Sequence, residues 1–320
     1  MSRAPRPAPP GPPPPGSRTV TTDDGVRLHV EFDGPPDAPL TVVFTHGFTA
    51  RLAEFEPQVD ALRDRARVVL WDQRGHGRSG WTKLTSATID RTGRDLGQVL
   101  DAVAPEGPVV LAGHSMGGMS IMALARQRPE LFGTRVVGIF LLATSAGGLV
   151  QSGLLGRAVG LMRRLHLLRL YLWFMQLMAP ALERYRRRGT TLGRWFTRRY
   201  LFGREDADRA SVRRVQELLE ETPYPVVMAF YATLLEHDET AALPVVGRVP
   251  VTVVAASDDR LTPAAHGRRM AELIGGNAQL VVVPGAGHSV NLTRPGVVND
   301  ALLGLLDRVR DRPQEGRRAG

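Results

Sequence analysis

Residues 108–118, Pro-Val-Val-Leu-Ala-Gly-His-Ser-Met-Gly-Gly, join an apolar run to a segment that favours helix from Met119 to Gln127. The apolar run predicts a strand that is buried on both faces. A sharp turn from strand into helix lifts the hydroxyl of Ser115 out of the sheet and strains the backbone at that residue. Neighbouring elements then approach closely at positions 113 and 117, so glycine is needed at both. The stretch therefore predicts a strand–turn–helix unit that presents a serine.

Strands and helices alternate on both sides of this unit. Apolar and β-branched runs predict strands at residues 20–22, 26–32, 40–45, 68–71, 109–112, 136–143, 251–255 and 280–283. Helical spacing predicts helices at residues 57–64, 90–103, 119–127, 263–274 and 294–308. The alternation indicates an α/β fold, in which helices flank a mostly parallel, twisted sheet of about eight strands.

The alternation stops between residues 147 and 244, where helical spacing replaces strands. One predicted helical face carries Leu161, Leu165, Leu168, Leu172, Met175 and Ala179. This stripe either packs the segment against the body of the protein or, with Trp173 nearby, lines an acyl pocket. We therefore expect a helical lid at 147–244, inserted after the sixth strand and between two parts of the core, 19–146 and 245–309. Residues 1–18 are expected to form a disordered Pro-rich tail, and residues 310–320 a polar tail.

The net charge of +9 is concentrated in the expected lid. Between Arg157 and Arg214 the chain has fifteen arginines and four acidic residues. A basic cluster of this kind attracts anionic lipid surfaces or acidic substrates, and a solvated basic face is the alternative. No recognition motif for nucleic acid accompanies the charge, so nucleic acid is not an expected partner.

Several kinds of segment and site are missing from the sequence. No run reaches the ~18–20 apolar residues that a membrane span needs. The first residues lack the apolar core of a secretory signal. The chain has no cysteine, which excludes disulfides and thiolate chemistry. We expect a cytoplasmic protein with, at most, peripheral contact with an anionic membrane through the Arg-rich lid, and no cofactor or metal.

A serine becomes a strong nucleophile only beside a base, and the base needs a carboxylate to orient it. In a fold with this elbow the chain order is serine, acid, histidine. His288 follows a buried strand and lies at the carboxyl edge of the sheet, whereas His266 falls inside a predicted helix. Asp259 lies at the junction of a strand and a loop, and Asp258 is the alternative acid. The expected catalytic residues are therefore Ser115, Asp259 and His288.

The same chemistry needs backbone donors for a negatively charged oxygen. The N–H of Met116 follows the nucleophile at the start of a helix, where the helix dipole favours negative charge. The second donor is expected from the loop His46-Gly47-Phe48-Thr49, at the N–H of Phe48.

Five motifs in this order resemble the α/β-hydrolase superfamily, and specifically its lidded serine hydrolase branch, which is esterase-like or lipase-like. They are His46-Gly47-Phe48, Asp72-x-Arg74-Gly75-x-Gly77-x-Ser79, Gly113-His114-Ser115-Met116-Gly117-Gly118, Asp259-Arg260-Leu261-Thr262-Pro263 and Gly287-His288. The resemblance implies that the loop from Asp72 to Ser79, with Arg74 and His76, is structural and lies near the site.

The resemblance also narrows the reaction, because dehalogenases and epoxide hydrolases of this fold have Asp where Ser115 stands. It implies a carboxylic-ester hydrolase acting on small esters, lipids or thioesters through an acyl-enzyme. The alternatives are C–C bond hydrolysis or perhydrolysis with the same residues, or a non-catalytic binder of small molecules. We expect substrate contacts from His46, Gly47, His114 and Trp173.

Overall fold

The computed structural model describes residues 14–81, 84–149, 161–162, 164–167, 170–171, 173–175, 177–179, 199–204, 215 and 222–312. Its centre is an eight-stranded sheet in the order β1-β2-β4-β3-β5-β6-β7-β8. The strands are β1 (Arg18–Thr21), β2 (Arg27–Asp33), β3 (Thr41–Thr45), β4 (Arg67–Trp71), β5 (Val109–His114), β6 (Val136–Leu142), β7 (Val251–Ala256) and β8 (Ala278–Val283). Only β2 runs antiparallel to its neighbours in this sheet, so the predicted, mostly parallel α/β fold is confirmed.

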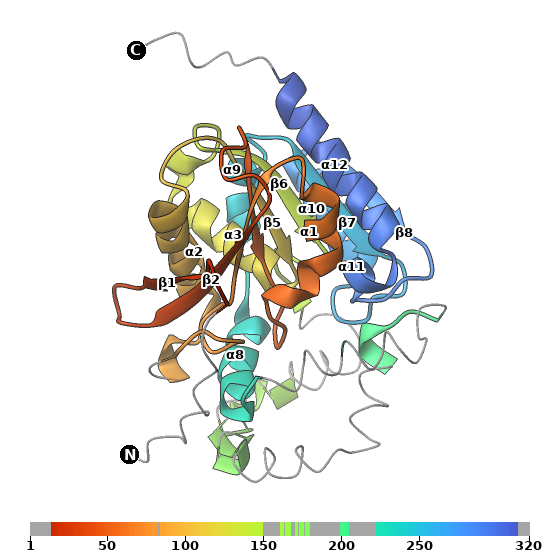
Figure 1. The fold of residues 1–320 in the computed structure, drawn as a ribbon. Coiled ribbons are helices and arrows are strands. Elements are labelled where there is room, and N and C mark those ends of the chain that lie inside the picture. Colours follow the sequence, from red (N-terminus) through yellow and green to blue (C-terminus); the bar gives the residue numbers. More distant parts are fainter. Residues whose placement is uncertain are drawn as a thin grey trace.

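Helices cover both faces of the sheet (Figure 1). One layer consists of α2 (Ile89–Val103), α3 (Met116–Gln127), α9 (Leu243–Val246) and α10 (Ala264–Ile274), and the other of α1 (Glu56–Leu62), α11 (Val290–Thr293) and α12 (Pro295–Asp311). The first layer buries Leu96, Met119 and Met270 against the sheet. The second buries Leu62 and Leu302 in a separate core. Every residue of β3 and β5 is buried, as a strand covered on both faces requires.

The parallel strands end at one edge, and this edge positions the functional residues. The register pairs Thr45 with Gly113, His114 with Leu142, and Ala256 with Val283. The residues that follow β3, β5, β7 and β8 therefore meet in space although they are far apart in the sequence. In open α/β sheets this carboxyl edge is where ligands bind.

The segment between β6 and β7 is only partly described. No strand occurs in its described residues, which include α8 (Tyr224–Glu236) and the short helix η5 (Thr240–Ala242). Figure 1 shows α8 beyond one end of the sheet, apart from the two helical layers. That residues 147–244 act together as a lid stays a prediction.

The predicted apolar stripe does not form one packed face. Leu161 is 57% exposed and Leu165 is 56% exposed, whereas Ala179 is buried. Residues 161, 162 and 164 are helical and are followed by a turn at 165–166, where His166 has φ 55°, so the residues before and after the turn do not share one helical phase. Leu168 and Leu172 lie outside the described residues.

The ordered core extends beyond both predicted boundaries. Arg18 already pairs with Val30 in β1, so the strand starts inside the expected tail. At the other end α12 continues to Asp311. Arg308 and Arg310 lie in its last turn, where the helix dipole interacts favourably with positive charge. None of the helices in the described part of the chain is both long and apolar enough to span a bilayer.

Candidate active site

The turn between β5 and α3 has the strain that the sequence predicts. Ser115 has φ 51° and ψ −117°, a backbone conformation that costs about 1–3 kcal/mol for a residue with a side chain. An added Cβ at Gly113 would lie 2.6 Å from the backbone of Gly117 and Gly118, and one at Gly117 would overlap the carbonyl oxygen of Thr45. Only glycine at these positions lets the helix start this close to the sheet.

Ser115, His288 and Asp259 meet at the carboxyl edge of the sheet. The hydroxyl of Ser115 lies 2.9 Å from Nε2 of His288, and Nδ1 of His288 lies 2.8 Å from Oδ2 of Asp259. All three side chains are nearly buried, with residue exposures of 9%, 5% and 4%. The geometry lets Nδ1 donate to the carboxylate while Nε2 accepts the proton of the serine hydroxyl.

The surroundings of Asp259 keep it ionised. Burial opposes ionisation, but attraction to His288 and hydrogen bonds from His288 and Thr262 lower the pKa of Asp259 below its usual value. Its Oδ1 accepts from the N–H groups of Leu261 and Thr262, and its Oδ2 accepts from the hydroxyl of Thr262 at 2.7 Å. The neighbouring Asp258 instead accepts from the N–H of Arg204 at 3.3 Å.

His266, the other histidine that the chain order allowed as the base, is hydrogen-bonded to a different serine. His266 lies on α10, and its Nδ1 is 2.9 Å from the hydroxyl of Ser145. Burial lowers the pKa of His266. Of the two candidates, the structure therefore brings only His288 to Ser115.

The two expected backbone donors are both free among the described residues. The N–H of Gly47 donates to Glu54 at 2.7 Å, and the N–H of Thr49 donates to Nε2 of His76 at 3.1 Å. The N–H of Phe48 between them has no described partner, and neither has the N–H of Met116 at the start of α3. Hydrogen bonds at Gly47 and Thr49 thus fix the loop on either side of the N–H of Phe48.

A buried ion pair lies behind these groups. Both carboxylate oxygens of Glu54 are 3.2 Å from Nδ1 of His114, and Nε2 of His114 is 3.1 Å from the carbonyl oxygen of His288. With Glu54 ionised, both partners accept, so both ring nitrogens donate, as they do in the charged imidazolium. Burial alone would disfavour that charge, but Glu54 and the His288 carbonyl raise the pKa of His114 above its usual value.

The sequence predicts His46, Gly47 and His114 as substrate contacts, and their hydrogen bonds are used within the protein instead. His46 is fully buried; its Nδ1 donates to the carbonyl of Gly47, and its Nε2 accepts from the N–H of Gln73. Gly47 and His114 are bonded to Glu54. The ring nitrogens of His46 and His114 are therefore all bonded within the protein, and substrate contact by these residues stays a prediction.

The structure also describes two other features that the sequence singled out, Trp173 and the loop after β4. Trp173, also expected to contact substrate, is 59% exposed. The loop after β4 is held by Arg74, which is buried and forms a bidentate pair with Asp95 at 2.5 and 2.8 Å. The prediction of a structural loop agrees with this pairing.

Sequence reasoning missed Glu54 and Thr262. Glu54 is 60 positions from its partner His114, and no local pattern marks a carboxylate that pairs over such a distance. Thr262 stands inside the Asp259–Pro263 motif, so its proximity to Asp259 was the available signal. Phe230 of α8 was also not foreseen: its ring centroid lies 6.4 Å from that of Phe48 and 5.4 Å from that of His76.

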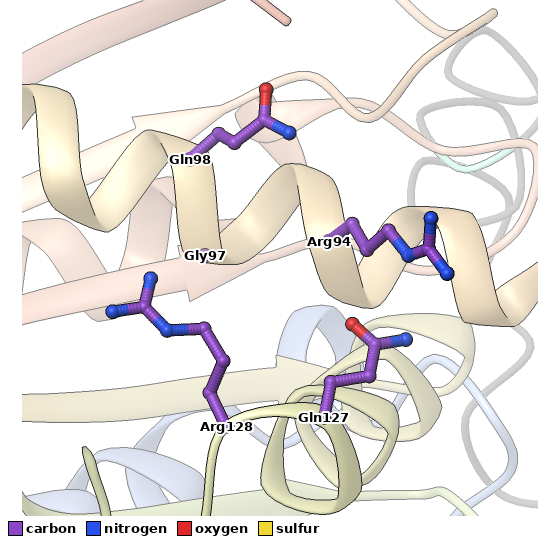
Figure 2. A pocket seen from close by; sticks show the side chains of 5 residues that line it. All are labelled: Arg94, Gly97, Gln98, Gln127 and Arg128. Carbon is purple, nitrogen blue, oxygen red and sulfur yellow. The ribbon is translucent and has the colours of Figure 1, made fainter. Parts of the chain in front are cut away.

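A surface hollow of about 370 Å³ lies between α2 and the end of α3 (Figure 2). Its lining residues are Arg94, Gly97 and Gln98 on α2, and Gln127 and Arg128 at the end of α3. Arg128 already pairs with Asp101 at 2.6 Å, and Arg94 pairs with Asp90 at 3.5 Å. The hollow shares no residue with the candidate site.

Comparison with known proteins agrees with the fold and the motifs. A model of the family described as "Alpha/beta hydrolase family" matches residues 42–301. RutD of Caulobacter sp. (strain K31), whose name makes it a candidate carbamate hydrolase, is 30% identical over 292 residues, which cover 89% of this chain and 97% of the relative. The 3-oxoadipate enol-lactonase 2 of Acinetobacter baylyi is 27% identical over 291 residues, which cover 91% and 96%.

Among solved structures, a thermophilic esterase from Thermogutta terrifontis superimposes with a TM-score of 0.72 at 24% identity, covering 92% of this chain and 98% of the esterase. An enol-lactonase from Burkholderia xenovorans LB400 gives a TM-score of 0.69 at 22% identity, with coverages of 91% and 100%. These two likenesses show the shared fold.

The buried His76 predicts a pH dependence of stability. Burial lowers its pKa from 6.5 to about 4, so it stays neutral in the folded protein at pH values where the unfolded chain takes up a proton. Its contribution to the free energy of unfolding is complete above pH 6.5 and falls by about 3 kcal/mol as the pH drops to 4. Urea unfolding of the wild type and His76→Gln at several pH values measures this difference.

The comparison with His76→Gln is needed because the titration of Asp72 changes the stability in the opposite direction between pH 4 and pH 6.5. Burial raises the pKa of Asp72 to about 6, so its contribution is present at low pH and is lost as the pH rises through 6. Equal pH slopes for the wild type and His76→Gln would contradict the assignment to His76.

Proposed function

Because this chain belongs to the alpha/beta hydrolase family, we propose that it hydrolyses carboxylic esters through an acyl-enzyme formed on Ser115. One observation carries the proposal: the continuous hydrogen-bonded path from Ser115 through His288 to Asp259, with distances of 2.9 and 2.8 Å. A base that accepts from a serine and donates to a carboxylate is the arrangement that makes a hydroxyl nucleophilic.

In the acylation step the oxygen of Ser115 attacks the ester carbonyl carbon while its proton moves to Nε2 of His288. Asp259 accepts from Nδ1 throughout and stabilises the imidazolium that forms. The pKa of Asp259, held low by His288 and Thr262, supports this role because the carboxylate remains charged. Collapse of the tetrahedral intermediate breaks the bond to the alcohol, which leaves with the proton from Nε2.

The negative charge on the carbonyl oxygen would be received by the N–H groups of Phe48 and Met116. Support comes from their neighbours, because the adjacent N–H groups of Gly47 and Thr49 are already bonded to Glu54 and His76. Fixed donors need no reorganisation when charge develops, and one of them is worth on the order of 10²–10³ in turnover. Water then attacks the acyl carbon with His288 as base, which regenerates the hydroxyl of Ser115.

The names of the relatives guide the choice of substrates to test. A carbamate, an enol-lactone and a simple ester all present an acyl carbonyl to the nucleophile. A panel of p-nitrophenyl esters of increasing chain length, a lactone and a carbamate therefore tests which acyl group the site accepts. The non-catalytic alternative predicts no turnover of any of them.

Replacement of the nucleophile gives the first test. A fluorophosphonate probe should label the wild-type protein and leave Ser115→Ala unlabelled, because only the activated hydroxyl attacks phosphorus. Ester turnover of the variant should fall by on the order of 10⁶, as for other residues that act within such a set. Mass spectrometry of the labelled peptide identifies the modified residue.

Labelling of Ser115→Ala to the same extent as the wild type would sink the proposal. Circular dichroism of both proteins checks that the variant is folded. A labelled wild type that turns over none of the panel would retain the nucleophile and exclude the tested substrates.

The two adjacent carboxylates give a matched pair of variants. Asp259→Asn should lower kcat by about 10⁴, because an amide cannot hold His288 in the tautomer that accepts from the serine. Asp258→Asn should leave kcat within about twofold of the wild type, because that side chain faces Arg204. Steady-state kinetics on the best ester of the panel measures both, and a larger loss in Asp258→Asn would reverse the assignment.

A further inference from the structure

An apolar helical face in the segment between β6 and β7 is exposed. Residues 170, 171, 173–175 and 177–179 are helical. Five large apolar side chains on this stretch are exposed: Leu170 59%, Trp173 59%, Phe174 51%, Leu177 61% and Met178 37%. Their spacing of three, four, seven and eight residues from Leu170 places them on one side of the helix.

The opposite side of the same helix faces the protein. Ala179 is 1% exposed, and Tyr171 and Met175 are partly buried. A surface helix normally has polar residues on its outward side, because apolar side chains are stabilised only when they are buried away from water. Large apolar side chains lie on both sides of this helix. Its outward side therefore has the composition of a buried face but is exposed in the described part of the chain.

Leu167 extends this exposed apolar face by one turn: it is 45% exposed, and its carbonyl oxygen accepts from the N–H of Tyr171 at 2.9 Å. We term these six side chains the outer apolar surface: Leu167, Leu170, Trp173, Phe174, Leu177 and Met178. Leu161 and Leu165, before the turn at His166, are 57% and 56% exposed. Monomeric soluble proteins rarely present so many large apolar side chains together, and such surfaces mark binding sites.

The charge of the same segment identifies the partner. From residue 147 to residue 182 the sequence has four arginines and no aspartate or glutamate. Arg164, which stands in the sequence between the exposed Leu161 and Leu165, is exposed. Each basic residue near an anionic lipid surface contributes about 1 kcal/mol of attraction, and tryptophan favours the interface between lipid and water. A helix with an apolar face and flanking arginines matches an element that lies in the plane of a membrane surface.

We propose that the outer apolar surface docks this protein on an anionic lipid bilayer. Trp173, Phe174 and Leu177 insert among the acyl chains near the headgroups, and Arg164 lies among the anionic headgroups. The docking is separate from the ester hydrolysis proposed above, because it involves none of the residues around Ser115.

Co-sedimentation of the full chain with vesicles tests the docking. The wild type should pellet with vesicles of phosphatidylcholine and phosphatidylglycerol in equal parts, and much less with phosphatidylcholine alone. Trp173→Ser/Phe174→Ser should weaken binding by about tenfold to a hundredfold, because two aromatic side chains no longer leave water. The matched control is Leu273→Ser/Val297→Ser, which removes two exposed apolar residues from α10 and α12 and should bind as the wild type does.

Three results would overturn the docking proposal. The wild type stays in solution with anionic vesicles, or the control double variant loses binding as much as the Trp173 and Phe174 variant does. In the third, the wild type sediments as a dimer without lipid and the Trp173 and Phe174 variant as a monomer, which makes the surface an interface between two copies. Circular dichroism confirms that each variant keeps its helices.

A separate observation, the buried pair of Glu54 and His114, carries a second inference, which rests on the proposed function. The Glu54 carboxylate holds the N–H of Gly47, next to the proposed donor of Phe48, and it pairs with His114, which holds the carbonyl of His288. The main chain of Glu54 also accepts from the side chain of Asn291, just beyond His288. One carboxylate thus connects the loop of the backbone donor with the loop of the base.

We infer that Glu54 is a positioning residue for the N–H of Phe48 and the ring of His288. It touches neither the substrate nor the reacting atoms, and it acts through Gly47 and His114. In an oriented site a displacement of about 1 Å costs about a hundredfold in rate. Replacing the carboxylate with an amide leaves one acceptor oxygen where there were two, so Gly47 and His114 compete for it and the charge of His114 loses its partner.

Turnover counted per working site separates positioning from stability. Fluorophosphonate titration gives the concentration of folded, reactive protein, and kcat is then expressed per titrated site. Glu54→Gln should lower this kcat by about tenfold to a hundredfold and change KM by less than about twofold. Glu54→Asp, which keeps the charge, should recover part of the loss. The control Glu272→Gln, on exposed α10, should match the wild type.

An unchanged kcat per titrated site in Glu54→Gln, with fewer sites titrated, would reduce Glu54 to a stabilising residue and overturn the positioning role. Failure of the wild type to react with the probe is a different outcome, since it overturns the proposed function itself.

Discussion

The close approach of α3 to the ends of β3 and β5 is the constraint on which the site depends. The helix starts so near the sheet that a side chain at Gly117 would overlap the carbonyl of Thr45. The chain can follow this path only with Ser115 in a strained conformation, φ 51°. The strain is retained because β5 is hydrogen-bonded on both sides and α3 is buried along one layer. The hydroxyl is therefore fixed before any partner residue is considered.

Around this fixed point the protein buries several charged groups that have partners. Asp259 receives hydrogen bonds from two N–H groups and from Thr262, Glu54 is paired with His114, and Arg74 is paired with Asp95. Removing one member of such a pair costs more than the pair contributes, because the remaining charge stays buried. The network thus makes the relative positions of the loops rigid, and rigidity is what a site of fixed donors requires.

The sequence predicted the buried strands of the sheet well because they are apolar runs bounded by turn residues, and it predicted the elbow because glycine and serine stand at required positions. It predicted less where a residue depends on distant partners. Asp258 and Asp259 are adjacent and alike in sequence, and only the turn that presents the N–H groups of Leu261 and Thr262 aims one of them at His288. Periodicity alone also overlooked the turn at His166, which separates two helical stretches that looked continuous.

The contact of Phe230 with both Phe48 and His76 links α8 to the loop of the proposed donor. Displacement of α8 would remove an aromatic neighbour from that loop, so outward movement of α8 and disorder of the loop favour each other. Thermodynamic reciprocity then requires that a ligand held by an ordered loop also draws α8 inward. The position of α8 and the order of the loop that carries the N–H of Phe48 would in this way share a single conformational equilibrium.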